Sequence, residues 1–271
     1  MPELPEVESV VRKLRHDRIV GARIQRIEVL RPSSVRPQSP DDIDRLTRKQ
    51  TIRKIERRAK NILIHLSKER VIRIHFGMTG DLALLRKGAE MPNAARLAWI
   101  LSGSRQLVFS DGRALGRANV LSSEEWSALD AELGPEPLAR SFTSDRFYQS
   151  CQSSRLPAKL FLMDQSKIAG LGNIYAAEAL FRGKVSPTRP MNTLTQAETG
   201  KLHSAIRQTL RSAIQSVYRA YRKPGGYRQH GDDFERAVYG RAGLPCPVCG
   251  REIRRIRQGG RSTYFCSYCQ R

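Results

Sequence analysis

The sequence has no long run of uncharged apolar residues and no lipidation signal, which argues against a membrane anchor. Its first six residues, Met-Pro-Glu-Leu-Pro-Glu, lack the basic start and apolar segment of a secretory signal. We therefore expect a cytoplasmic protein. Cysteine is also scarce, with five residues in 271, and in a reducing compartment such residues favour metal binding over disulfides.

Acidic residues are few compared with basic ones. The chain has 26 Asp and Glu against 48 Lys and Arg, a formal charge of +22. Such an excess is hard to explain as solubility alone and suits a polyanionic partner. Nucleic acid is the leading candidate, and an anionic membrane surface is the alternative. We expect a monomer that associates with the bacterial nucleoid.

Hydrophobic periodicity changes along the chain. An amphipathic helix is expected at 5–16, followed by short runs rich in Ile, Val and Leu that resemble the strands of an antiparallel sandwich. In the run 71–76, Arg73 and His75 share the polar face. Beyond the Gly-Pro-Glu-Pro break at 134–137 the pattern is helical, including a stripe about 25 residues long that follows a capping box at 195–198. The expected strands are 24–30, 52–55, 61–66, 71–76, 97–101 and 106–109.

These patterns predict a multidomain α+β fold. We expect an antiparallel β-sandwich with flanking helices at 1–134, a helical domain at 135–236 and a small metal-bound hairpin at 237–271. The break at 134–137 places the first boundary. The cysteine cluster near the end of the chain indicates where the small third domain lies.

Four cysteines have the spacing of a zinc site. Cys246 and Cys249 form one C-x2-C pair, sixteen residues follow, and Cys266 and Cys269 form the second. Four thiolates leave no open position for water, so we expect one structural Zn²⁺. The fifth cysteine, Cys151, reads as an ordinary thiol. Several arginines crowd this unit and suit phosphate binding, although a solvated basic face is the simpler reading for most of them.

The residue after Met1 is Pro2. Removal of Met1 would expose a secondary amine, and an α-amino group titrates near ~8, so a useful fraction is nucleophilic at neutral pH. Such an amine can form an iminium with a sugar C1′. On composition alone, however, Pro2 and Pro5 are better explained as residues that shape the start of a helix.

Longer motifs change that balance. The string Pro-Glu-Leu-Pro-Glu-Val-Glu at 2–8 resembles the start of the formamidopyrimidine-DNA glycosylases, the Fpg family. Residues 57–60 resemble that family's lysine motif, 75–80 its inserting loop, and 170–176 its helix-two-turns-helix signature. The cysteine cluster stands where the family has a zinc finger. The resemblance covers nearly the whole chain.

The resemblance implies a bifunctional DNA glycosylase and abasic-site lyase of base excision repair. A damaged nucleotide is flipped out of double-stranded DNA, and Pro2 attacks its C1′ to form a Schiff base. Glu3 is placed to move protons, and β,δ-elimination then cuts the strand. Glu6 lies one helical turn from Glu3, where stabilising the helix start is as good an explanation as a catalytic role. The resemblance also implies that Lys60, Asn173 and Arg261 contact phosphates.

The hole left by flipping is filled, by the same resemblance, by Met78, Arg113 and Leu115. The family usually has Phe at the position of Leu115, so stacking on DNA is expected to be weaker here. The stretch 217–239 lacks the Gly-Gly-Thr-Thr motif of many purine-specific members, which bears on lesion preference. Many members of the family carry a His-containing segment ahead of the next strand. This chain has Pro-Asn-Ala-Ala there, at 92–95, which removes a possible phosphate contact.

Oxidised purines, namely 8-oxoguanine and formamidopyrimidines, are the expected substrates because the N-terminal string is of the Leu-Pro-Glu type. An endonuclease VIII-like preference for oxidised pyrimidines or abasic sites is the nearest alternative. A non-catalytic zinc-containing DNA-binding protein is an alternative of another class, which the charge and zinc site alone would equally support. A simple DNA-binding protein, however, needs no free N-terminal amine.

Overall fold

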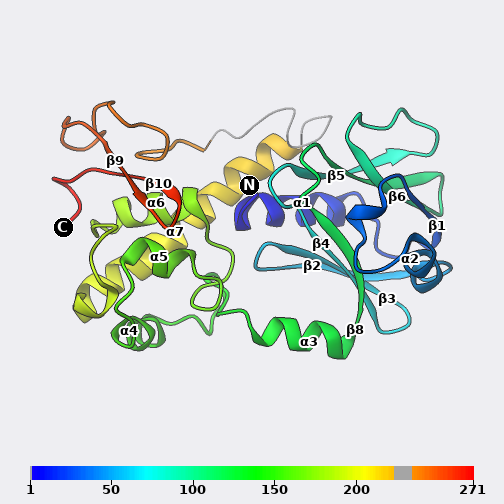
Figure 1. Ribbon diagram of the computed structural model, residues 1–271, viewed down its shortest axis with the longest axis horizontal. Coiled ribbons are helices and arrows are strands. Elements are labelled where there is room, and N and C mark those ends of the chain that lie inside the picture. Colours follow the sequence, from blue (N-terminus) through cyan, green and yellow to red (C-terminus); the bar gives the residue numbers. More distant parts are fainter. Residues whose placement is uncertain (1, 223–233) are drawn as a thin grey trace. The chain divides into compact units, whose positions relative to one another are not determined.

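The computed structural model describes residues 2–222 and 234–271, and Figure 1 shows its helices and strands. The described residues form two compact units. One comprises 2–131 and 214–222, and the other 132–213 and 234–271. The mixed α+β architecture confirms the predicted fold class. The predicted three-domain division stays a prediction.

Two four-stranded antiparallel sheets build the first unit, with strand orders β1-β6-β7-β5 and β2-β3-β4-β8. Alternating apolar residues from both sheets meet in one core that includes Ile72, Ile74, Trp99 and Phe109. The strands are β1 (Ile24–Val29), β2 (Ile52–Arg58), β3 (Asn61–Leu66), β4 (Arg70–His75), β5 (Gly80–Arg86), β6 (Ala95–Leu101), β7 (Arg105–Asp111) and β8 (Arg117–Ser122).

Sequence periodicity found six of these strands and missed β5 and β8. In β5 three of the four central residues are Leu, a run that favours helix as readily as strand, and β8 has a single β-branched residue, Val120. Pairing with neighbours decides both: β5 pairs with β7 from Gly80 to Arg86, and β8 pairs with β4 along its length. Tertiary contacts therefore override weak local preference.

Three helices accompany the sheets: α1 (Leu4–His16), α2 (Pro40–Thr47) and α3 (Ser123–Ala131). The predicted first helix is confirmed, and Val7, Val10, Val11 and Leu14 are all buried. Pro5 suits its first turn because proline supplies a helical φ and no N–H is needed there. Arg15 and His16 lie in the last turn of α1, where a positive charge interacts favourably with the negative end of the helix dipole.

The second unit contains α4 (Ser144–Gln152), α5 (Ala158–Met163), α6 (Asn173–Arg182) and the hairpin of β9 (Arg254–Gln258) and β10 (Arg261–Phe265). The 26-residue α7 (Gln196–Tyr221) matches the predicted stripe, and it contributes to both units because the division falls after Ala213. Two short 3-10 turns lie at Pro32–Ser34 and Met191–Thr193. In the described part of the chain, no helix combines the length and apolarity that a membrane span requires.

Candidate active site and nucleic-acid interface

The start of α1 brings two buried carboxyl groups beside Pro2. Glu3 is 2% exposed and Glu6 is 5% exposed, while Pro2 is half-buried. The Glu3 backbone N–H donates to Oε2 of Glu6 at 2.7 Å, and the pair forms a capping box. Glu6 thus caps the start of the helix. Glu3 is held next to the chain end by the same contact.

Lys60 lies on the two-residue turn of the β2–β3 hairpin and is 8% exposed. Its neighbour Ala59 adopts a positive φ of 53°, a strained conformation for a residue with a Cβ. Arg57 stabilises this turn from inside, because its Nη1 donates to the Ala59 carbonyl at 3.0 Å while its Nε contacts Oε2 of Glu8 at 3.2 Å. Through Glu8, the hairpin that carries Lys60 is fastened to α1, the helix that follows Pro2.

His75, at the end of β4, was not predicted as a site residue. Burial, followed by the positive charges of Arg73 and Lys60, lowers the pKa of His75 from 6.5 to about 4. The Gly77 backbone N–H donates to its Nδ1 at 3.2 Å, so the ring is neutral at pH 7 and presents Nε2 as a donor. The sequence offered one signal for it, because the alternation in this strand places His75 on the same polar face as Arg73.

The three predicted wedge residues are exposed and lie on two loops of the first unit. Met78, in the β4–β5 loop, is 37% exposed, and Leu115, in the β7–β8 loop, is 49% exposed. Arg113 is exposed on the same loop as Leu115. The two loops touch, because a Cβ on Gly77 would lie 2.6 Å from the backbone carbonyl carbon of Leu115. The structure therefore brings together three residues that the sequence places in two segments.

Asn173 and Arg261 come together in the second unit. Asn173 is the first residue of α6, and its Nδ2 donates to the Ser262 carbonyl at 3.1 Å. The buried Lys159 of α5 donates to the same carbonyl at 3.1 Å and to Oγ1 of Thr263 at 2.9 Å. Arg261, one residue away, is exposed. Oδ1 of Asn173 is buried and has no hydrogen-bond partner among the described residues.

Glu178 is a second buried residue that sequence patterns did not single out. From α6 its carboxylate accepts three backbone N–H groups, those of Ala237, Val238 and Tyr239, at 2.8 to 3.0 Å. With three backbone donors, the Glu178 side chain is well satisfied although it is only 5% exposed. It fixes the chain where it leads into the cysteine cluster.

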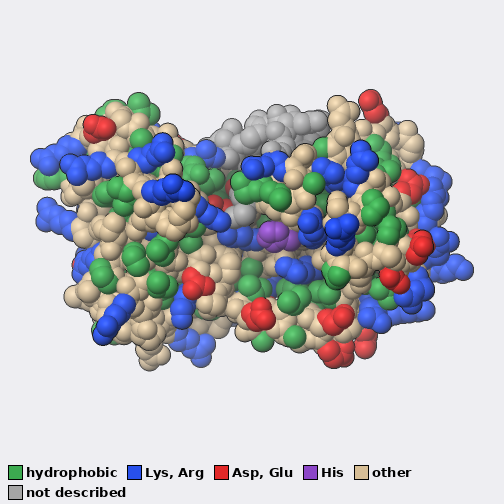
Figure 2. Space-filling view, viewed as in Figure 1, with side chains coloured by type: hydrophobic (Ala, Val, Ile, Leu, Met, Phe, Trp, Pro, Cys, Tyr) green, Lys and Arg blue, Asp and Glu red, His purple; other side chains and the backbone are tan. Residues whose placement is uncertain are grey.

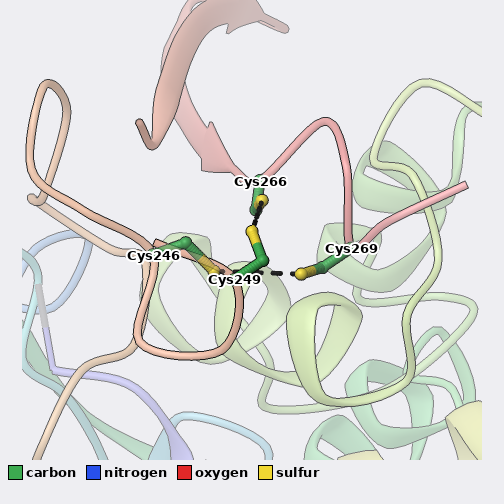
Figure 3. Close-up of side chains that lie close together, drawn as sticks. All are labelled: Cys246, Cys249, Cys266 and Cys269. Atoms are coloured by element: carbon green, nitrogen blue, oxygen red, sulfur yellow. Dashed lines mark hydrogen bonds between the residues drawn. The ribbon is translucent and has the colours of Figure 1, made fainter. Parts of the chain in front are cut away.

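The four cysteines converge as predicted (Figure 3). Their Sγ atoms all lie within 4.8 Å of one another, with Cys246 and Cys269 3.9 Å apart and Cys249 and Cys266 3.5 Å apart. Thiolates at about 2.3 Å from a tetrahedral zinc would be about 3.8 Å apart, so the cluster fits Zn²⁺. Each pair forms a knuckle, in which the Gly250 and Gln270 N–H groups donate to the carbonyls of Cys246 and Cys266.

Basic side chains are abundant on the surface. Figure 2 shows Lys and Arg over much of the visible face of both units, with Asp and Glu in smaller groups. The zinc hairpin alone exposes Arg251, Arg254, Arg255, Arg257 and Arg261. A surface of this sign attracts phosphates.

Family models and solved structures agree with this geometry. Residues 1–118 match the formamidopyrimidine-DNA glycosylase N-terminal domain, 133–222 the H2TH domain of the same enzymes, and 243–271 a zinc finger found in Fpg and IleRS. A formamidopyrimidine-DNA glycosylase of Chloroflexus aurantiacus is 41% identical over 100% of this chain and 98% of its own. One of Thermus thermophilus is 37% identical over 100% of this chain and 98% of its own.

Two solved structures of Lactococcus lactis Fpg are 32% identical to this chain, and each match covers 99% of both chains. One is a complex with DNA containing an abasic site, with a TM-score of 0.89. The other is a complex with DNA containing Fapy-dG, with a TM-score of 0.88. Fold, zinc cluster and matched domains define a DNA glycosylase of base excision repair. The chain belongs to the formamidopyrimidine-DNA glycosylase family.

Proposed function

We propose that this glycosylase is bifunctional and that the amine of Pro2, freed by removal of Met1, is its nucleophile. The observation that carries this proposal is the position of Pro2, half-buried at the start of α1 and directly followed by Glu3, whose carboxyl group is almost fully buried. A proline amine has a lone pair available near neutral pH, and a neighbouring carboxyl group can move the protons that the reaction requires.

The proposed reaction begins on a nucleotide flipped out of the duplex. The Pro2 nitrogen forms a bond to C1′, the glycosidic bond breaks, and the base departs with that electron pair and takes up a proton. The C1′–O4′ bond then opens to an iminium while Glu3 supplies a proton to O4′. Loss of a proton from C2′ expels the 3′ phosphate, and a second elimination expels the 5′ phosphate. These β- and δ-eliminations leave a one-nucleotide gap.

Two sets of residues, one in each unit, are proposed to contact the DNA. Lys60, beside His75, is proposed to bind a phosphate near the lesion from the first unit, and Asn173 and Arg261 to bind flanking phosphates from the second. The exposed guanidinium of Arg261 supports this assignment, because it offers N–H donors to phosphate oxygens and lies one residue from the Ser262 carbonyl that Asn173 and Lys159 hold in place. Met78, Arg113 and Leu115 would fill the space that the flipped nucleotide leaves.

Oxidised purines are the proposed substrates, specifically 8-oxoguanine and formamidopyrimidines. The relatives carry formamidopyrimidine in their names, and one solved relative holds Fapy-dG in DNA. The altered stretch at 217–239 bears on this preference, but its residues 223–233 lie outside those that the structure describes. Oxidised pyrimidines and abasic sites therefore belong in the same assay. We propose that the active species is a monomer on double-stranded DNA.

The test is borohydride trapping by a protein whose N-terminus has been checked by mass spectrometry. Duplexes would carry 8-oxoguanine, formamidopyrimidine, thymine glycol or an abasic site. We expect a covalent adduct on Pro2, and we expect more adduct on the duplexes with purine lesions than on the others. A matched variant with Met1 retained by an extra N-terminal residue should bind the same duplexes and form no adduct. If a chain shown to start at Pro2 forms no adduct on any duplex, Pro2 is not the nucleophile and the bifunctional mechanism is refuted.

A further inference from the structure

A buried carboxylate lies beneath the proposed wedge. Asp111 is the last residue of β7 and is 1% exposed, so it cannot itself reach DNA. The β7–β8 loop that carries Arg113 and Leu115 begins directly after it. Its pairing partner Gly80 begins β5, directly after the loop that carries Met78. Asp111 thus stands at the common base of both loops.

Each oxygen of this carboxylate binds a different part of the two loops. Oδ1 accepts the hydroxyl of Thr79 and, at 3.1 Å, the backbone N–H of Arg113. Oδ2 accepts the backbone N–H of Gly116 at 2.7 Å. The Arg113 N–H is shared with the Thr79 hydroxyl oxygen, 3.0 Å away. One side chain therefore connects Thr79, next to Met78, with both ends of the segment 113–116.

Backbone packing leaves these loops little freedom to separate. Gly77 has a φ of +58°, and a Cβ there would lie 2.7 Å from the Gly116 nitrogen. A Cβ on Gly116 would lie 2.6 Å from the Phe109 ring. Burial alone would raise the pKa of Asp111, but the hydrogen bonds from Thr79 and from the Gly116, Arg113 and Leu115 N–H groups outweigh burial and lower it. The carboxylate is therefore ionised, which strengthens each of these bonds.

We propose that Asp111 is a positioning residue that holds Met78, Arg113 and Leu115 in one fixed arrangement, so that all three enter the duplex as a preformed wedge. The inference rests on the proposed function of those three side chains. Groups that must fit a narrow space act best when a second layer of hydrogen bonds holds them before binding. Asp111 supplies that layer for two loops at once, and Thr79 transmits it to the Met78 loop.

The experiment compares Asp111→Asn and Thr79→Val with wild type and with Thr79→Ser, which keeps the hydroxyl. Each is assayed for excision from a lesion-containing duplex and for borohydride trapping on a single-stranded abasic oligonucleotide, where no wedge is needed. A 2-aminopurine next to the lesion reports unstacking. We expect Asp111→Asn and Thr79→Val to lose about 10- to 100-fold in kcat/KM on the duplex. The 2-aminopurine fluorescence should change more slowly in these two variants, while their trapping on the single strand should match wild type. Thr79→Ser should match wild type in every assay.

Two results would overturn the positioning role of Asp111, and a third would refute the proposed chemistry instead. Wild-type duplex activity in both folded variants overturns the positioning role, and so does an equal loss on duplex and single strand. Failure of wild type to form a Pro2 adduct on any substrate refutes the proposed chemistry instead. Thermal melting checks the fold of each variant. If Asp111→Asn does not fold, Thr79→Val decides, because it removes only one hydroxyl from a half-buried position.

Discussion

Arg57 of β2 contacts Glu8 of α1 at 3.2 Å, with side chains only 8% and 18% exposed. The contact joins α1, the helix that follows Pro2, to the hairpin that carries Lys60. A buried ion pair therefore links the segments that carry a proposed nucleophile and a proposed phosphate contact, 58 positions apart in the sequence. Its Glu8 partner also binds Arg12, at 2.9 Å, on the solvent side.

Glu8→Ala is expected to destabilise the protein by about 1 to 3 kcal/mol, because it removes the carboxylate that faces a buried guanidinium. Urea unfolding measures the free energy of unfolding. Arg12→Ala is the matched control, since Arg12 is 43% exposed and its pair with Glu8 should contribute less than about 0.5 kcal/mol. Equal losses in the two variants would show that the buried pair has no special role.

His75 makes stability depend on pH. Its pKa is about 4 in the folded chain and 6.5 as the ordinary value, so between these limits the unfolded state binds more protons. Stability contributed by neutral His75 is complete above pH 6.5 and declines as pH falls toward 4, by on the order of 1 to 3 kcal/mol.

The control variant is His75→Asn, which retains an acceptor for the Gly77 N–H and does not titrate. Urea unfolding at pH 7 and pH 4.5 should show a larger decrease for wild type than for the variant. Parallel pH profiles would rule out His75 as the source.

Zinc removal is expected to unfold the hairpin of β9 and β10 and to abolish duplex binding, because a unit this small has little core without its metal. Cys249→Ser should lower the zinc content below the one ion per chain expected of wild type. Atomic absorption and circular dichroism measure the two effects. Cys151→Ala, at a buried cysteine outside the cluster, should retain full zinc content; loss of zinc there would contradict the assignment.

Arg261→Ala is expected to weaken binding to damaged and undamaged duplexes alike, because a phosphate contact carries no sequence information. The slope of log K against log salt should decrease in magnitude by about 0.9. Fluorescence anisotropy between low and moderate salt gives both quantities. Arg45→Ala is the control, since that guanidinium is ion-paired with Asp42 at 2.8 Å, and its salt slope should equal that of wild type.

Leu115→Phe should tighten binding to a duplex with a stable abasic-site analogue. Base stacking on an aromatic side chain contributes ~1 to 3 kcal/mol, so a gain of about fivefold is the lower expectation. The 49% exposure of Leu115 leaves room for the larger ring. Leu115→Ala should weaken binding. A Phe variant that binds no better than wild type would mean that residue 115 does not meet a base.

Much of this protein could be predicted from sequence because its signals are local. Helix α1 could be predicted from apolar residues at helical spacing, and the zinc cluster from two C-x2-C pairs. The excess of basic residues in the composition predicted a surface that suits a polyanionic partner. The roles of Pro2, Lys60 and Met78 came from family motifs rather than from periodicity. Strands β5 and β8 were missed because their sequences favour no single conformation.

Sequence by itself determined the fold class and the metal ligands, since each depends on residue type and short spacing, and the residues that carry the chemistry stay a prediction from family motifs. Only tertiary structure decided how those residues are held. Asp111 beneath two loops, Lys159 and Asn173 on the Ser262 carbonyl, and Arg57 against Glu8 are contacts between distant segments. Such contacts leave no periodic pattern, because a buried polar side chain is chosen by the donors and acceptors that folding brings around it.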